Sequence, residues 1–232
     1  MDNKKKLSVI IPCYNEKDSI REILRRIKEA YTDPMEIIIV DDCSKDGTRD
    51  ILKNEIESTV DRVIYCDVNR GKGAAIRTGL KAATGDAVII QDADNEYDPA
   101  DYRQVVKPIF EGRRKVVYGS RFMNDVHYDA AYKENIAANH FLTMLSNLFT
   151  HQRLTDMETC YKCLRRDVAE KVAPLLKEER FGFEPELTAR ISDLRIRITE
   201  VPISYAPRTR EEGKKIGFKD GLRAVYCILR YH

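Results

Sequence analysis

The sequence contains no tryptophan, no long apolar run and no excess of charge of one sign. Its 40 Lys and Arg residues nearly balance 38 Asp and Glu residues, which gives a formal net charge of +2, whereas a general nucleic-acid binder has a marked basic excess. No window approaches the ~20 apolar residues that a membrane-spanning helix needs. The start, Met-Asp-Asn-Lys-Lys-Lys, lacks the apolar core of a signal peptide. These absences argue against nucleic acid as a partner and predict a cytoplasmic protein without a transmembrane segment.

The six cysteines do not form a pattern of their own. In a reducing compartment free thiols are expected rather than a disulfide framework. Cys160 and Cys163 have the spacing of a redox pair or of half a zinc site, but no second close Cys or His pair exists to complete four ligands. We therefore interpret both as small buried side chains.

The chain of 232 residues, 43% hydrophobic and 34% charged, suits one large domain. In its first half, short β-branched runs alternate with amphipathic stretches. The predicted strands are 7–12, 36–40, 62–66 and 87–91, and the predicted helices are 19–30, about 46–57 and 73–83. This alternation is typical of an α/β fold, a mostly parallel sheet sandwiched by helices.

From about Val126 the pattern becomes mostly helical. Amphipathic stretches lie near 133–150 and 183–193, a strand follows around 196–205, and a last helix begins near Phe218. We predict one domain over 1–232, whose C-terminal part is a helical elaboration packed on the sheet. Ligands of such sheets bind at the carboxyl ends of the strands, so residues that follow strands are the first candidates for a binding site.

The strongest chemical signal is Gln91-Asp92-Ala93-Asp94-Asn95-Glu96, directly after an apolar strand. Alternate residues of an extended segment point the same way, so Asp92, Asp94 and Glu96 could converge on one hard cation. An acidic loop that caps the next helix would explain Asp98 before Pro99, but not three carboxylates at alternate positions. We favour a site for Mg²⁺ or Mn²⁺.

Two further segments follow the first two strands, and a third opens a helix. Tyr14 could stack on a planar base and Asp42 could accept hydrogen bonds from it, although each taken alone could equally be part of a turn or a cap. Together, at neighbouring carboxyl ends of a parallel sheet, they outline a nucleotide pocket. The segment 69–77, Asn-Arg-Gly-Lys-Gly-Ala-Ala-Ile-Arg, matches neither common phosphate-binding motif. It could approach phosphates through backbone N–H groups, and a purely structural Gly-rich helix start is about as well supported.

Taken together, these motifs resemble the family 2 inverting glycosyltransferases of GT-A fold. The motifs are Leu7 to Glu16, Ile39 to Gly47, Asn69 to Gly73 and Asp92-Ala-Asp94. Within that family, Gly119-Ser-Arg121, Thr155-Asp156 and Val201-Pro202 through Arg208 are similar to the polyprenyl-phosphate glycosyltransferases, such as dolichyl-phosphate mannose synthase and dolichyl- or undecaprenyl-phosphate glucosyltransferase. The resemblance covers about residues 7–220.

The resemblance implies a role for each matching residue. A half over about 1–125 would bind the nucleotide sugar, and a half over about 126–232 would face the acceptor. The residues implied to bind the nucleotide sugar are Pro12, Tyr14, Glu16, Val40, Asp42, Asp92, Ala93, Arg208 and Lys214. The implied metal site is Asp92, Asp94 and Glu96, and the implied catalytic residues are Asp94, Asp156 and Arg121, of which Arg121 would meet the acceptor phosphate.

The implied reaction moves a hexose from a nucleotide sugar, of the UDP-glucose or GDP-mannose type, to a polyprenyl phosphate. A divalent cation and basic side chains would stabilise the departing diphosphate. An anionic phosphate acceptor needs positioning more than a strong base, whereas a saccharide hydroxyl needs proton abstraction. Transfer to a saccharide hydroxyl by a non-processive enzyme is the alternative, because the processive synthases carry a Gln-x-x-Arg-Trp motif and this chain has no Trp.

Two departures from the family matter. Many members have a lysine where this chain has Glu184, so one cation near the diphosphate is expected to be missing. Members also commonly end in membrane helices, and none is predicted here. We therefore expect the protein to lie peripherally on the cytoplasmic face of a membrane, or to be a catalytic subunit active only with a membrane-protein partner. Residues 205–232 carry seven Lys or Arg against three acids. This local basic excess could bind the diphosphate or face anionic lipid headgroups.

Overall fold

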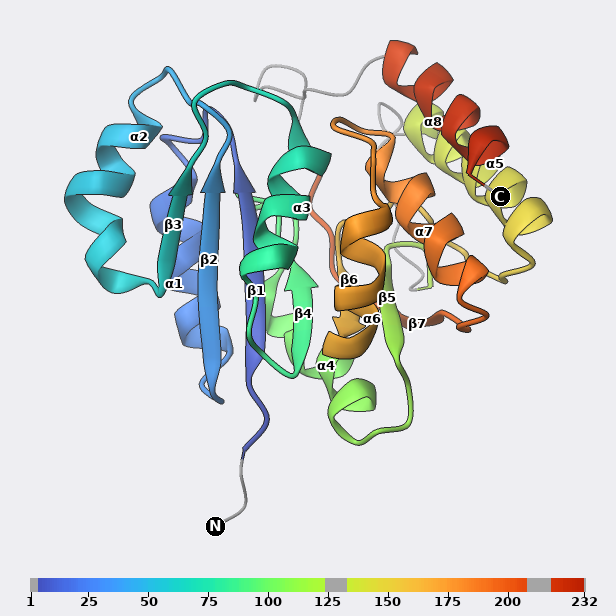
Figure 1. Ribbon diagram of the computed structural model, residues 1–232, viewed down its shortest axis with the longest axis horizontal. Coiled ribbons are helices and arrows are strands. Elements are labelled where there is room, and N and C mark those ends of the chain that lie inside the picture. The colour runs from blue at the N-terminus through green and yellow to red at the C-terminus, as the bar shows by residue number, and fades with distance from the viewer. Residues whose placement is uncertain (1–3, 124–132, 208–217, 232) are drawn as a thin grey trace.

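The computed structural model describes residues 4–123, 133–207 and 218–231, and shows one sheet flanked by helices (Figure 1). The strands are β1 (Leu7–Cys13), β2 (Met35–Asp41), β3 (Arg62–Tyr65), β4 (Ala87–Ile90), β5 (Val116–Ser120), β6 (Lys162–Arg165) and β7 (Thr199–Pro202). The helices are α1 (Ile20–Ala30), α2 (Thr48–Ile51), α3 (Lys72–Ala82), α4 (Tyr102–Phe110), α5 (Lys133–Thr150), α6 (Arg166–Val172), α7 (Phe183–Asp193) and α8 (Phe218–Arg230). The predicted change of pattern at Val126 lies outside the described residues.

The seven strands follow the order β3-β2-β1-β4-β6-β5-β7. Pairing is parallel except at β6, which is antiparallel to both β4 and β5. Helices α3 and α6 cover the face of the sheet nearer the viewer, and α1 and α4 cover the other (Figure 1). The predicted α/β fold with a mostly parallel sheet between helices is confirmed.

The local pattern explains the helices and strands of the first half. In α1, Ile20, Ile23, Leu24 and Ile27 recur at helical spacing, and all four are buried as predicted. Strand β1 is buried along nearly its whole length and mostly apolar, as is typical of parallel strands covered on both faces. The predicted helix over 46–57 is irregular, since α2 continues as a π-helix over Leu52–Ile56.

Three elements were not predicted, namely β5, β6 and α6. Strand β6 is short and begins with a lysine, so its sequence carries little strand signal. Lys162 is nevertheless buried there, because its ammonium donates to the carbonyl oxygen of Met157 at 2.6 Å and lies 3.9 Å from the ring centre of Tyr118. The C-terminal part therefore supplies strands to the sheet in addition to helices packed on it.

Cys160 and Cys163 are free and buried, as predicted. Burial raises the pKa of the Cys160 thiol, and Asp92 raises it further.

Among helices of the described ranges, none combines the length and the apolar character that a bilayer crossing requires.

A buried carboxylate joins β1, β2 and the turn before β4 at the amino ends of the strands. Glu36 accepts hydrogen bonds from Thr84 N at 2.6 Å, Thr84 Oγ1 at 2.7 Å, Gly85 N at 3.0 Å and Lys6 Nζ at 3.2 Å, and also from the Ser8 hydroxyl. Burial alone would raise the pKa of Glu36, but these donors lower it from 4.5 to about 2. The carboxylate is therefore ionised in the folded protein, and its hydrogen bonds hold these segments together.

We expect Glu36→Gln to lower the free energy of unfolding at neutral pH by about 3 kcal/mol, the equivalent of that pKa shift. Because the pKa is lower in the folded state, this stability is present above about pH 4.5 and is lost as the pH falls towards 2. Urea unfolding across this range measures it, and the variant should show a flatter acid limb. Glu29→Gln, on an exposed carboxylate of α1, should change stability by less than about 0.5 kcal/mol. A wild-type-like acid limb in Glu36→Gln would contradict the prediction.

Candidate active site

The loops after β1 and β2 lie side by side at the carboxyl edge of the sheet, as predicted. Pro12 is paired in register with Val40, and Asp42 N donates to the carbonyl of Cys13 at 2.8 Å. Asn15 ties the two loops together, because its N–H donates to Ser44 Oγ at 2.9 Å and its Oδ1 accepts from Lys45 N at 2.9 Å. The two halves of the predicted nucleotide pocket therefore adjoin.

The residues expected in that pocket differ in exposure. Pro12, Tyr14 and Glu16 are partly exposed, and Glu16 accepts a hydrogen bond from Ser19 Oγ at 2.6 Å. Val40 is fully buried in an apolar cluster with Ile38 and Ala75, so its side chain belongs to the core. A pocket at this edge would be lined by the loop after β1 rather than by the Val40 side chain.

Asp42 is buried and organises the segment before α3. Its Oδ1 accepts from Arg70 N at 2.9 Å and its Oδ2 accepts from Gly71 N at 2.6 Å. Gly71 has φ +102°, and a Cβ there would lie 2.5 Å from the carbonyl oxygen of Glu179, so only glycine fits. Ala74 N donates to that same carbonyl oxygen at 3.1 Å. Because these N–H groups already have protein partners, the structure favours a structural Gly-rich helix start over a phosphate cradle.

Lys72, the first residue of α3, links two carboxylates at the centre of the edge. Its Nζ lies 2.9 Å from Asp92 Oδ1 and 3.1 Å from Glu184 Oε1. Burial opposes the charge of the ammonium, but Asp92 and Glu184 raise the pKa of Lys72 well above its ordinary value. A cation from α3 therefore lies beside Glu184, the position at which many family members have a lysine. Sequence reasoning did not single out Lys72, and its only signal was a cation at the start of a Gly-rich helix.

The acidic loop after β4 is shaped by hydrogen bonds. Asp94 Oδ1 accepts from Glu96 N at 3.1 Å, and Glu96 Oε2 accepts from the Tyr205 hydroxyl at 3.1 Å. Within the described ranges, no three Asp, Glu, His or Cys side chains are grouped closely enough to hold a metal by themselves. Asp92 and Asp94 still fit Mg²⁺ or Mn²⁺, because such ions are often held by one or two carboxylates with substrate phosphates and water. Participation of Glu96 stays a prediction.

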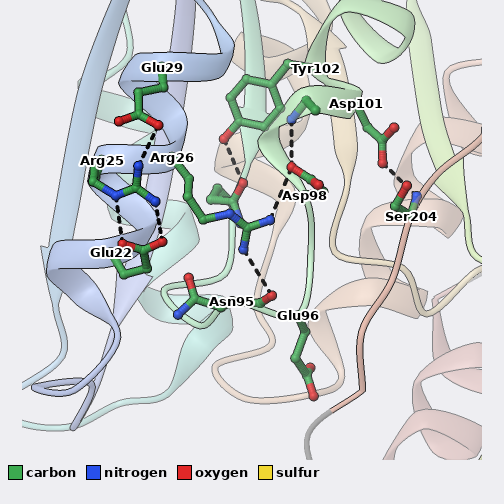
Figure 2. Close-up of polar contacts among 12 residues, drawn as sticks. Glu22, Arg25, Arg26, Glu29, Asn95, Glu96, Asp98, Asp101, Tyr102 and Ser204 are labelled. Carbon is green, nitrogen blue, oxygen red and sulfur yellow. Dashed lines mark hydrogen bonds and ion pairs between the residues drawn. The ribbon is translucent and has the colours of Figure 1, made fainter.

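Side chains of α1 and α4 form polar contacts that hold the acidic loop and the residue before it in place (Figure 2). Arg26 donates to the carbonyl of Asn95 at 3.3 Å and lies 3.2 Å from Asp98 Oδ1. Asp98 also accepts from Ala100 N at 3.0 Å, the predicted cap. Deeper in the sheet, Gln91 Oε1 accepts from the hydroxyls of Tyr102 and Tyr161, each at 2.8 Å. The backbone that carries Asp92 and Asp94 is thus anchored on both sides.

Arg121 and Asp156 form a buried ion pair after β5. Arg121 Nε and one terminal nitrogen each lie 2.7 Å from a different Asp156 oxygen, and Arg121 N donates to Asp156 Oδ2 at 3.0 Å. Asp156 is fully buried and Arg121 is 5% exposed. Glu200 of β7 holds the Asp156 loop by accepting from Thr155 N at 2.7 Å and Asp156 N at 2.9 Å. The two predicted acceptor-side residues are therefore brought together as one unit.

The half-buried residue Glu158 interacts electrostatically with both members of this pair. Burial, with a contribution from Glu184, raises the pKa of Glu158 to about 8. One oxygen of Glu158 and one of Glu184 are buried and have no hydrogen-bond partner among the residues that the structure describes. Burial also lowers the pKa of Lys162 to about 8. Sequence reasoning missed Glu158 and Lys162, because nothing in their local pattern distinguishes them from surface residues.

Arg208 and Lys214 lie outside the described residues. The segment that leads to them is described, and it runs beside the acidic loop. Tyr97 forms an antiparallel bridge with Tyr205, and Ala206 N donates to the carbonyl of Glu96 at 2.8 Å. The guanidinium carbon of Arg121 lies 5.1 Å from the ring centre of Tyr205. The late segment therefore connects the acidic loop to the Arg121–Asp156 pair.

Comparison with known proteins agrees with this arrangement. The family described as glycosyl transferase family 2 matches residues 8–173, most of the chain. The chain belongs to glycosyltransferase family 2. Its polar loops at the carboxyl edge are accordingly those of a glycosyltransferase.

This family 2 glycosyltransferase is similar to proteins that are named for sugar transfer to a lipid phosphate. It is 29% identical over 242 residues to a dolichyl-phosphate beta-glucosyltransferase of Dictyostelium discoideum, covering 97% of this chain and 73% of that one. It is 33% identical over 215 residues to an undecaprenyl-phosphate 4-deoxy-4-formamido-L-arabinose transferase of Serratia proteamaculans, covering 90% and 63%.

Among solved structures, the fold matches glucosyl-3-phosphoglycerate synthase from Mycobacterium tuberculosis, in complex with Mn²⁺, UDP and glucosyl-3-phosphoglycerate. The TM-score is 0.72 at 19% identity, over 97% of this chain and 79% of that chain. The likeness confirms the GT-A fold predicted from the sequence.

Proposed function

We propose that this glycosyltransferase moves a hexose from a nucleotide sugar to a polyprenyl phosphate, with inversion and with Mg²⁺ or Mn²⁺ bound. The observation that carries the proposal is the meeting of three groups at one edge of the sheet. These are the loops after β1 and β2 with Asp42, the Asp92–Asp94 loop with Lys72, and the Arg121–Asp156 pair.

The donor side is supported by the chemistry of its residues. The base and ribose would lie beside the adjoining loops that carry Tyr14 and Asp42, and Asp42 would shape this pocket through its bonds to Arg70 N and Gly71 N. Asp92 and Asp94 would hold the metal, which when bound offsets the negative charge of the departing diphosphate. Lys72 is fixed next to Asp92 at 2.9 Å, and its ammonium would stabilise the same charge from the protein side. Arg208 and Lys214 stay proposed contributors to that charge.

The acceptor side is supported by Arg121 and by the relatives' names. A phosphate acceptor is already anionic, so it needs a cation to position it rather than a base to deprotonate it. Arg121 is pre-oriented by its two bonds to Asp156, and its guanidinium is the cation that would meet the acceptor phosphate. The two relatives described above are named for dolichyl and undecaprenyl phosphates. One name gives a hexose, glucose, and the other a substituted pentose, so the proposal of a hexose rests on the family resemblance and not on these names.

Product analysis with two acceptors tests the proposal. The purified chain, given UDP-glucose or GDP-mannose and Mn²⁺, should glycosylate a short-chain polyprenyl phosphate and not an oligosaccharide. Thermal unfolding with UDP-, GDP- and TDP-sugars identifies the donor beforehand, because a ligand at 100 times its Kd stabilises the folded state by about 2.7 kcal/mol. Transfer to the oligosaccharide alone would favour the non-processive saccharide transferase instead. Activity only after a membrane protein is added would show the need for a partner.

A further inference from the structure

Lys72 and Glu184 each depart from a local preference, and they contact each other. Lys72 is the first residue of α3, where the positive end of the helix dipole disfavours a cation. Glu184 is only 4% exposed, and one of its carboxylate oxygens has no hydrogen-bond partner among the described residues. An incompletely paired buried carboxylate is costly for folding. Departures of this kind are typical of functional sites, so the pair is a candidate for a role in binding.

The backbone of Lys72 is held beside α7 by the glycines on either side of it. Helix α3 begins at the edge of the sheet towards which β1 and β2 point (Figure 1). A Cβ at Gly71 would lie 2.5 Å from the carbonyl oxygen of Glu179. A Cβ at Gly73 would lie 3.0 Å from the Cβ of Phe183, the first residue of α7. The starts of the two helices are therefore in direct contact, which fixes the point from which the Lys72 side chain extends.

The three N–H donors of the Lys72 ammonium have three carboxylate oxygens within reach. Its Nζ lies 2.9 Å from Asp92 Oδ1, 3.2 Å from Asp92 Oδ2 and 3.1 Å from Glu184 Oε1. The side chains of Lys72 and Asp92 are 18% and 19% exposed, whereas that of Glu184 is 5% exposed. Asp92 is therefore the partner that solvent and ligands can reach, and Glu184 is the partner that is closed to them.

This difference in exposure gives the two carboxylates different tasks. Asp92 would share its oxygens with the divalent cation, so its contact with the ammonium would weaken when a metal is bound. Glu184 is the acceptor that would still hold the ammonium in place. A neutral side chain at 184 would hold it less well, because the start of α3 and the bound cation both repel the ammonium. A negative charge at this position therefore keeps Lys72 next to Asp92.

We propose that Glu184 is a positioning residue of the donor side, which holds the Lys72 ammonium beside Asp92 for contact with the diphosphate of the nucleotide. The inference deepens the proposed function and rests on its donor half alone. It does not depend on whether the acceptor is a polyprenyl phosphate or a saccharide. Binding of a nucleotide, without sugar or acceptor, therefore measures it.

Calorimetric titration of the full chain with UDP and with GDP, each in the presence of Mn²⁺, tests the proposal. The nucleotide that binds the wild-type chain more tightly is used for the variants. Glu184→Gln keeps the size of the side chain and an oxygen that can accept from Lys72, but it removes the charge. It should weaken nucleotide binding about ten-fold, in the range of one charged hydrogen bond. Lys72→Gln should weaken binding at least as much, and adding Glu184→Gln to it should cause no further loss, because Glu184 acts through Lys72.

Glu186→Gln is the matched control, because Glu186 lies on the same helix and is fully buried. Its carboxylate accepts from Lys177 N at 2.9 Å and from Glu178 N at 2.7 Å. The change should lower the thermal unfolding temperature and leave nucleotide affinity within about two-fold of wild type. The proposal is overturned if Glu184→Gln binds the nucleotide as tightly as the wild-type chain, or if its loss adds in full to that of Lys72→Gln. Transfer to an oligosaccharide in the product analysis would contradict the proposed acceptor and leave this result unchanged.

Discussion

Replacing Asp94 by Asn is expected to abolish turnover while leaving the protein folded. The variant keeps the size of the side chain, and its Oδ1 can still accept the hydrogen bond from Glu96 N that shapes the loop at 3.1 Å. It removes the negative charge that would hold the divalent cation. Loss of a group that stabilises developing charge costs on the order of 100-fold to 1,000-fold in kcat. Initial rates at saturating donor and Mn²⁺ measure the loss.

Asp98→Asn provides the matched change on the same loop. Asp98 caps Ala100 N and pairs with Arg26, and it has no proposed part in the reaction. An amide oxygen can keep the cap, so we expect turnover within about two-fold of wild type and a small loss of stability. If Asp94→Asn retained wild-type turnover, the assignment of the metal site would be wrong.

Replacing Asp156 by Ala is expected to have the largest effect on stability. Its carboxylate is fully buried and takes two bonds from the Arg121 side chain and one from its backbone. Without it, the buried guanidinium of Arg121 loses the carboxylate that binds it at two nitrogens, which costs about 3–5 kcal/mol. For a chain of this length that cost corresponds to a fall of roughly 10 °C in Tm. Calorimetry and urea unfolding measure it.

The surface supplies a pair of the same chemistry for comparison. Arg165 and Asp167 form a bidentate contact at 2.6 and 2.8 Å, with side chains 37% and 42% exposed. Asp167→Ala should cost less than about 1 kcal/mol, because water replaces the lost partner. If both variants lost the same free energy of unfolding, burial would not determine how much the Arg121–Asp156 pair contributes to stability.

The elements that could be predicted from the sequence are those with a local pattern. The apolar spacing of Ile20, Ile23 and Ile27 predicts α1, and amphipathic spacing predicts α5 and α7 with bounds of 133–150 and 183–193 that the structure reproduces. Residues that follow strands were predicted to meet, and the adjoining loops after β1 and β2 confirm this. Periodicity and strand-end position are properties of short segments, so they can be read without the fold.

What could not be predicted depends on contacts between distant segments. Lys72 gains its place only because Asp92 and Glu184 come from two other parts of the chain. Strand β6 is short and begins with Lys162, and it is a strand because β4 and β5 flank it. The raised pKa of Glu158 likewise reflects burial next to Glu184. These features require the tertiary structure, which no local pattern contains.

The position of β6 has a consequence for how the protein folds. Strands β1 to β4 pair in parallel through nearby segments, so this portion can assemble as the first half of the chain leaves the ribosome. The edges of β4 and β5 that face each other stay unpaired until β6 arrives between them. We therefore expect the Thr155–Asp156 loop, which directly precedes β6, to acquire its shape late. Nascent chains that stop short of residue 165 also lack β7, so they would expose the open edge of β4 and leave β5 without either of its partner strands, a template for aggregation.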